Sequence, residues 1–117
     1  MRPQENGSKT DVRWVTLTNA QGIGLMAAGE QVLNVSARHF TKDDLENAAY
    51  TFQMKRHPET YLNLDGKLMG AGGIDSWSLN AYPMPPYRIA SGEPRSYRYR
   101  LVPVDSPGGD QRARERL

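Results

Sequence analysis

The residues that could do chemistry by type and spacing gather in one glycine-rich segment near the middle of the chain. It reads Gly70-Ala71-Gly72-Gly73-Ile74-Asp75-Ser76-Trp77. Gly72 and Gly73 lack a Cβ and can take positive φ, so they permit a very tight backbone. Asp75 and Ser76 can lock such a turn by bonding their side chains to nearby backbone N–H groups. The pattern predicts a stiff turn that holds the ring of Trp77 where a ligand could meet it.

The other residues with chemical potential do not form a recognisable catalytic or metal set. His39 falls on the apolar side of a predicted strand, where we expect it to be buried and hydrogen-bonded, and His57 falls in a loop. The chain has no cysteine and no pair of histidines at helical spacing, so metal ligation is not expected. The glycine segment lacks the Gly-Lys-Ser/Thr of a phosphate loop. We therefore predict no catalytic residue and no cofactor in this chain.

Composition places the chain among small single domains. It has 117 residues, of which 38% are hydrophobic and 24% charged, with a formal net charge of +2. That charge is too small to imply nucleic acid as a partner. The alternating arginines and tyrosines of 95–100 could stack the bases of a single-stranded nucleic acid, but such alternation is more typical of a half-buried β-strand. No apolar stretch reaches the roughly 18 residues that span a bilayer. With no signal peptide at the first residues, we expect a soluble chain with no membrane partner.

The elements that must position the glycine segment are mostly strands. Runs rich in β-branched and aromatic residues predict strands at 12–18, 23–28, 32–40, 60–65, 87–90 and 95–104, a hairpin turn at 19–22 and an extended segment at 50–54. In 32–40 we expect Leu33, Val35, Ala37 and His39 to face the core. One helix is predicted over about 42–49, capped by Thr41 and Asp44. The fold class is mainly β, an antiparallel β-sandwich with one short helix.

The chain divides into an ordered part and a tail. Residues 1–104 carry the predicted elements, whereas 105–117 are charged and have few apolar side chains to bury. Such a segment cannot offset the entropy of ordering, so we expect a flexible charged tail.

Five blocks of sequence together carry a resemblance to a known family. They are Arg-Pro-Gln-Glu-Asn-Gly at 2–7, Asp-Val-Arg-Trp at 11–14, Phe-Thr-Lys-Asp-Asp-Leu at 40–45, Leu-Asn-Leu-Asp at 62–65 and Met-Gly-Ala-Gly-Gly-Ile-Asp-Ser-Trp at 69–77. In this order and spacing they resemble the C-terminal end of bacterial beta-galactosidases of glycoside hydrolase family 2. The resemblance covers residues 2–104. It implies the final part of a last domain that is a large β-sandwich of the galactose-mutarotase-like kind.

The resemblance also implies where the chemistry lies. The parent enzymes hydrolyse terminal β-D-galactosides such as lactose with retention, through two glutamates about 5 Å apart. Those glutamates, with Mg²⁺ and Na⁺ sites, belong to a TIM barrel earlier in the parent chain, so we expect the isolated segment to be inactive. Trp77 would reach from the last domain into the sugar pocket, with Gly72, Gly73, Asp75 and Ser76 as its supporting loop. The expected partners are the galactoside and the barrel domain, and the compartment is cytoplasmic or periplasmic.

Two alternatives stay open from the sequence. Trp77 could be a core residue, as we expect Trp14 to be, and the chain could be an independent carbohydrate-binding or interaction module. If the parent sandwich needs preceding strands, this chain leaves an unpaired edge and an uncovered apolar face, which favour self-association.

Overall fold

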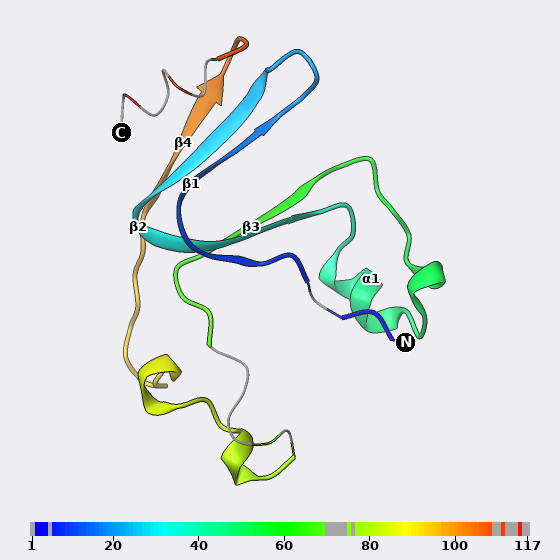
Figure 1. Cartoon of the computed structure of the whole chain (residues 1–117), viewed down its shortest axis with the longest axis vertical. Helices are drawn as coiled ribbons and strands as arrows, with labels where there is room; N and C mark the ends of the chain where they lie inside the picture. Colours follow the sequence, from blue (N-terminus) through cyan, green and yellow to red (C-terminus); the bar gives the residue numbers. More distant parts are fainter. Residues whose placement is uncertain are drawn as a thin grey trace.

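The architecture is an open antiparallel sheet with one short helix at its side (Figure 1). The computed structural model describes residues 2–4, 6–69, 75, 77–108, 111 and 115. The strands are β1 (Lys9–Thr18), β2 (Gly24–Arg38), β3 (Tyr61–Asp65) and β4 (Tyr99–Val104), and the helix is α1 (Lys42–Asn47). Three 3₁₀ turns cover Thr51–Gln53, Leu79–Ala81 and Pro85–Tyr87. Among the described residues, no helix is long and apolar enough to cross a bilayer.

The longest strand, β2, organises the sheet. β1 pairs along one edge of β2, while β4 pairs with Gly24 to Gly29 and β3 with Asn34 to Arg38 on the opposite edge. All these pairings are antiparallel. The mainly β, antiparallel fold class is therefore confirmed, and the predicted short helix is present as α1 among the described residues. The described strands all join this one sheet, so a second layer of a sandwich is not among them.

The prediction of two separate strands at 23–28 and 32–40 was wrong, because β2 is continuous. The chain bends near Gly29, where a Cβ would lie 2.1 Å from the Gln31 carbonyl oxygen and 2.8 Å from Cγ of Leu33. Only glycine allows the backbone to come this close. The bend lets one strand leave β4 and continue alongside β3, a course that Figure 1 shows clearly.

The local signals for the hairpin and the helix are confirmed. In the hairpin between β1 and β2, Oδ1 of Asn19 accepts from the backbone N–H of Gln21 and Ile23, and Gly22 has a φ of 76°. At the start of α1, Oγ1 of Thr41 accepts from the Asp44 N–H at 3.1 Å, and Oδ2 of Asp44 accepts from the Thr41 N–H at 2.7 Å. The helix ends at Asn47, two residues earlier than predicted.

The alternation expected for 32–40 holds only in part. Leu33 and Val35 are buried, but Ala37 is exposed, whereas Ser36 and Arg38 on the opposite face are buried. The reason is that the N-terminal segment covers this second face. Nε of Arg38 donates to the carbonyl oxygen of Asn6 at 2.9 Å, and one of its terminal nitrogens donates to Ser36 at 3.0 Å.

Three further expectations were wrong. Trp14 is 39% exposed rather than a core residue, because it lies on β1, which is an edge strand of the sheet. Residues 87–90 do not form a strand, since Tyr87 ends the last 3₁₀ turn. Residues 51–53 form a 3₁₀ turn instead of an extended segment, because Oε1 of Gln53 accepts from the N–H groups of Ala49 and Tyr50.

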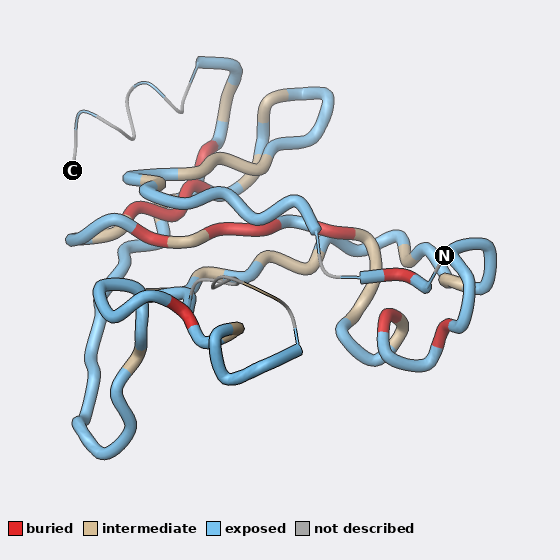
Figure 2. Tube along the Cα trace, turned by 60° about the horizontal axis from the view of Figure 1, so that its bottom comes forward, coloured by how far each residue is buried: buried red, intermediate tan, exposed pale blue. Residues whose placement is uncertain are grey.

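The core is small for a chain of this length. Buried residues follow the middle of β2 (Figure 2), and of the described residues only Met26 and Leu33 are large side chains that are fully buried. The Cα radius of gyration is 17.2 Å, whereas about 13 Å is expected for a compact domain of similar length. The chain is thus an open sheet with a projecting connection, and much apolar surface remains in water.

Candidate functional site

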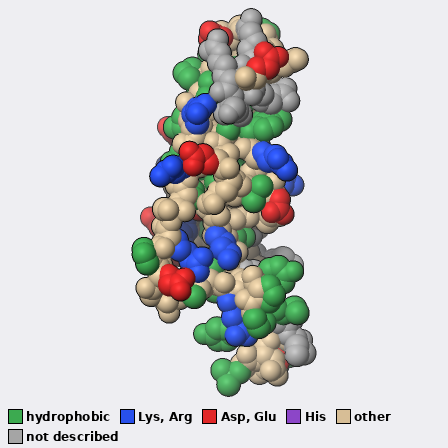
Figure 3. All heavy atoms as spheres, turned by 90° about the vertical axis from the view of Figure 1, so that its left-hand side faces the viewer, with side chains coloured by type: hydrophobic (Ala, Val, Ile, Leu, Met, Phe, Trp, Pro, Cys, Tyr) green, Lys and Arg blue, Asp and Glu red, His purple; other side chains and the backbone are tan. Residues whose placement is uncertain are grey.

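The candidate site lies on the connection between β3 and β4. We call residue 75 and residues 77–90 the arm; it extends away from the sheet, at the bottom of Figure 1. Its large apolar side chains are mostly in solvent, with Trp77 88% and Leu79 87% exposed. Figure 3 shows hydrophobic side chains gathered over this lower end of the molecule. Tyr82, Met84 and Tyr87 on the same arm are also exposed. The surface of a soluble monomeric protein rarely carries so many large apolar groups within one short segment.

Asp75 fixes the first turn of the arm. Its Oδ1 accepts from the backbone N–H of Trp77 at 3.0 Å and of Ser78 at 2.8 Å, and its Oδ2 accepts from Oγ of Ser78 at 2.5 Å. The Ser78 hydroxyl bond, followed by the two backbone bonds, lowers the pKa of the Asp75 carboxyl. Oγ of Ser78 in turn accepts from the Asn80 N–H at 3.0 Å, which caps the following 3₁₀ turn. The backbone of Trp77 is therefore held while its ring is in solvent.

Arg88 closes the far end of the arm, a role that sequence reasoning missed. Its Nε donates to the carbonyl oxygen of Pro83 at 2.6 Å, and its guanidinium lies 5.5 Å from the centroid of the Tyr82 ring. A cation over an aromatic face is attractive, so these two contacts tie the Pro-rich loop into a closed turn. The only signal in the sequence was a single arginine among apolar residues and prolines.

The predicted supporting loop is only partly within the described residues. Gly72, Gly73 and Ser76 lie outside the described residues. Asp75 and Trp77 both lie in the first turn of the arm, and the described part of the arm has an exposed aromatic ring but no acid and base pair around it. Such an arrangement can bind a ligand by dispersion and exclusion of water.

The two histidines are parts of the scaffold around α1. Nδ1 of His39 donates to the carbonyl oxygen of Glu59 at 2.9 Å, so His39 is hydrogen-bonded as expected, although it is only half-buried. Nε2 of His57 lies 2.9 Å from Oδ2 of Asp44. The pKa of Asp44 is lowered mainly by the side chain and backbone of Thr41, with His57 adding to the effect. Within the described part of the chain, no group of three or more His, Cys, Asp or Glu could hold a metal ion.

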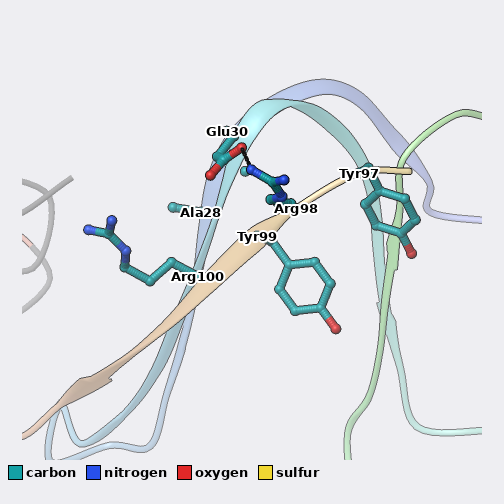
Figure 4. A pocket seen from close by; sticks show the side chains of 7 residues that line it. Ala28, Glu30, Tyr97, Arg98, Tyr99 and Arg100 are labelled. Carbon is teal, nitrogen blue, oxygen red and sulfur yellow. Dashed lines mark ion pairs between the residues drawn. The ribbon is translucent and has the colours of Figure 1, made fainter. Parts of the chain in front are cut away.

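The arginine and tyrosine side chains before and within β4 point in different directions. Figure 4 shows Tyr97 and Tyr99 on one side of the chain and Arg98 and Arg100 on the other. They line a shallow pocket of about 510 Å³, in which Nη1 of Arg98 lies 3.7 Å from Oε2 of Glu30. A nucleic-acid strand stacked on the tyrosines would not meet these arginines on the same face, so the arrangement does not support that alternative.

Comparison with known proteins gives the relationship of the chain. The family described as "Beta galactosidase small chain" matches residues 1–101. The chain is 36% identical over 83 residues to a beta-galactosidase of Priestia megaterium, a match that covers 71% of this chain and 8% of that protein. It is 36% identical over 76 residues to a beta-galactosidase of Halalkalibacterium halodurans, covering 64% of the chain and 8% of the relative. Beta-galactosidase BgaC of Bifidobacterium adolescentis is 29% identical over 102 residues, covering 85% of the chain and 10% of the relative.

Each of these matches involves a tenth or less of the relative's own length. The family match, in contrast, extends over most of this chain and includes the whole arm. The chain therefore belongs to the beta galactosidase small chain family.

Proposed function

We propose that this chain is the C-terminal segment of a glycoside hydrolase family 2 beta-galactosidase and supplies Trp77 to its sugar pocket. The family match and the names of the relatives support the enzyme class. The parent would hydrolyse terminal β-D-galactosides such as lactose. Its two catalytic glutamates, with the Mg²⁺ and Na⁺ sites, would lie in a barrel domain elsewhere in a longer polypeptide. No residue described above is assigned to those ions, and the isolated chain is proposed to be inactive.

The observation that carries the proposal is the exposed indole on a fixed backbone. Trp77 is 88% exposed, while Asp75 holds its N–H and Arg88 closes the loop that follows. A flat apolar ring can pack against the C–H face of a pyranose by dispersion and by excluding water. Its orientation would then favour one face of the sugar. Trp77 would bind and position the galactoside, while proton transfer and nucleophilic attack would come from the barrel.

The open sheet is consistent with a segment of a larger sandwich. Apolar side chains remain exposed on one face of β2 and β4, including Leu25, Tyr99 and Leu101. Burial of apolar area stabilises a fold by about 25 cal/mol per Å², so a second layer over these residues would be favourable. In the proposed parent, preceding strands of the same domain would provide that layer.

A chimeric enzyme tests the proposed role of Trp77 in catalysis. The segment of the Priestia megaterium beta-galactosidase that this chain matches would be replaced by this chain, and lactose hydrolysis measured. Trp77→Ala should reduce kcat/KM about tenfold, equivalent to roughly 1.4 kcal/mol, because the sugar loses one apolar wall. Leu79→Ala is the matched control, since it removes a neighbouring exposed side chain. Equal kinetics for the Trp77→Ala and parent chimeras would contradict the proposal.

A titration of the isolated chain separates the proposal from an independent binding module. Tryptophan fluorescence with lactose should show millimolar binding at best, because one wall of a pocket offers few contacts. Submillimolar affinity that disappears in Trp77→Ala would instead favour the module. The Trp77→Ala protein also gives the background emission of Trp14.

The exposed faces also predict self-association of the isolated chain. Uncovered apolar surface and free strand edges promote contacts between copies, and Ile23, Leu25, Tyr99 and Leu101 gather such surface on β2, its hairpin and β4. Sedimentation velocity should show oligomers that increase with protein concentration. A single monomeric species at every concentration would contradict this prediction.

A further inference from the structure

A groove separate from Trp77 opens where β2 bends. It has a volume of about 970 Å³ and lies between the start of β1, the end of β3 and the segment that leads into β4. Leu33, which is fully buried, contributes to its floor. Small-molecule sites typically have volumes of about 300–1,000 Å³ and combine apolar surface with a few polar groups. This groove is at the upper end of that range, with room for more than one sugar ring.

Tyr97 places a fixed aromatic ring in the groove. Its hydroxyl donates to the carbonyl oxygen of Leu64 at 2.9 Å. Its ring lies against Gly66, where a Cβ would be only 2.5 Å from Cγ of the tyrosine. The Tyr99 ring is 6.1 Å away, centroid to centroid. Tyr97 is nevertheless 43% exposed, so a ring whose phenol end and packing are fixed still offers surface to a ligand. An aromatic ring fixed in this way loses little freedom on binding.

Asp11 contributes a polar group from an unusual backbone conformation. It has a φ of 57°, the one positive value among the described residues other than glycine. It lies in an irregular part of β1, where the pairing register with β2 shifts between Lys9 and Val12. Irregularities of this kind redirect side chains and are common beside functional sites. Here Asp11 lines the groove.

Three further lining residues carry amide or carboxylate groups. Gln31, Asn34 and Asp65 line the groove with Asp11, and Asn34 is directly opposite Asp65 in the β2–β3 ladder. In the structure as described, none of these four side chains makes a hydrogen bond to the protein. They are therefore available to the hydroxyl groups of a ligand, which both donate and accept hydrogen bonds.

The charges of the lining indicate a neutral ligand. The carboxylates of Asp11 and Asp65 are balanced by the cations of Lys67 and Arg95. A phosphate would meet two carboxylates and a polyamine would meet two cations, and like charges in a shared site are unfavourable. A neutral molecule with many hydroxyl groups and one apolar face satisfies both the polar lining and the Tyr97 ring.

We propose that this groove binds a neutral saccharide of about two sugar units, with one pyranose ring against Tyr97 and its hydroxyls toward Asp11, Asn34 and Asp65. The groove includes Tyr87 and Ile89 from the far end of the arm but neither Asp75 nor Trp77, and it does not depend on the function proposed for Trp77. The two sites can be tested separately in the same chain.

The test is an NMR titration of the ¹⁵N-labelled chain with lactose. The amide signals of Asn34, Gly66 and Tyr97 should shift together, with one dissociation constant in the millimolar range. Asp11→Gly keeps the backbone conformation, because glycine accepts positive φ, and should weaken binding by about three- to tenfold. Tyr97→Ala should abolish the shifts, whereas Tyr97→Phe keeps the ring and should retain them. Trp77→Ala should leave the groove affinity unchanged.

Three results would overturn the proposal. The first is the absence of shifts at these amides at saturating lactose, with a folded spectrum. The second is unchanged affinity in both Asp11→Gly and Asp65→Asn. The third is binding of an uncharged β-strand hexapeptide at the same amides without any response to lactose, which would make the groove a peptide site. Because Trp77→Ala is measured in parallel, failure of the groove leaves the test of Trp77 intact.

Discussion

The start of α1 with Thr41, Asp44, Leu45 and His57, here called the α1 corner, and the arm use the same local hydrogen bonds but differ in what those bonds lead to. In each, one carboxylate accepts three hydrogen bonds from nearby groups: Asp44 from the backbone and hydroxyl of Thr41 and from His57, and Asp75 from Trp77 and Ser78. Both pKa values are lowered for that reason. In the α1 corner the fixed turn leads to Leu45, which is buried, whereas in the arm it leads to Trp77, which is exposed.

The difference shows that a well-formed polar turn does not by itself indicate whether the apolar side chain beside it is buried or exposed. A cap fixes the direction of the backbone, and the surrounding chain then decides whether the next apolar side chain has something to pack against. Around α1 the N-terminal segment provides a cover, since a guanidinium nitrogen of Arg2 donates to the carbonyl oxygen of Glu46 at 2.9 Å. The arm extends beyond the sheet, so its apolar side chains remain available to a partner or ligand.

A pair of leucine truncations tests this difference with the largest expected effect. Leu45 is 7% exposed and Leu79 is 87% exposed. Leu45→Ala should lower the free energy of unfolding by about 2–4 kcal/mol, because it leaves a cavity in a small core. Leu79→Ala should change it by less than about 0.5 kcal/mol. Urea unfolding followed by circular dichroism measures both values. Equal losses would mean that the arm packs on the body of the chain in solution.

The cap of α1 is a second test, with a smaller effect. Thr41→Ala removes the hydroxyl that accepts from the Asp44 N–H and should destabilise the fold by about 1 kcal/mol. Ser78→Ala removes the corresponding cap of the 3₁₀ turn in the arm and should leave global unfolding unchanged. Hydrogen exchange at Asn80 should nevertheless become faster, because that amide loses its partner. A global loss from Ser78→Ala would contradict the independence of the two regions.

The features that could be predicted from the sequence are those decided by nearby residues. The hairpin at Asn19 and the cap at Thr41 depend on contacts within four residues, and both were found. The merging of two strands into β2 depends on Gly29, where the backbone approaches Leu33 closely and the strand continues without the expected break. Burial of Arg38 depends on a segment 32 residues away. No local sequence pattern indicates that a distant segment covers a side chain.

The candidate site likewise combines features set by nearby residues with features set by segments that are distant in sequence. Asp75 was expected to lock its turn through its side chain, and its bonds to Trp77 and Ser78 have that local form. Arg88 was missed because its contact with Pro83 follows from the shape of a loop with several prolines. The groove at Tyr97 joins four segments that are distant in sequence, and only the folded sheet brings them together. Exposure of Trp14 likewise depends on the position of β1 at the edge of the sheet, which hydrophobicity alone cannot predict.

Acid titration should distinguish the contributions of the two carboxylates, Asp44 and Asp75, to stability. Each has a folded pKa below its unfolded value of about 3.9, so each contributes stability that is present above the unfolded pKa and is lost as the pH falls through the folded one. Protonation of Asp44 should lower the unfolding temperature of the whole chain, because α1 packs through Leu45. Protonation of Asp75 should act only on the arm, increasing amide exchange at Trp77 and Ser78 without affecting global unfolding.

Asparagine variants make the acid test specific. Asp44→Asn should reduce the decrease in unfolding temperature below pH 4, since the side chain that titrates there is gone. Asp75→Asn should leave that decrease as it is and should remove the acid-dependent loss of protection at Trp77, because the amide oxygen still accepts from that N–H but the side chain no longer titrates. If the two variants changed the acid profile of global unfolding equally, the arm would be coupled to the body. Exposure of its indole would then depend on the stability of the whole chain rather than on the Asp75 turn.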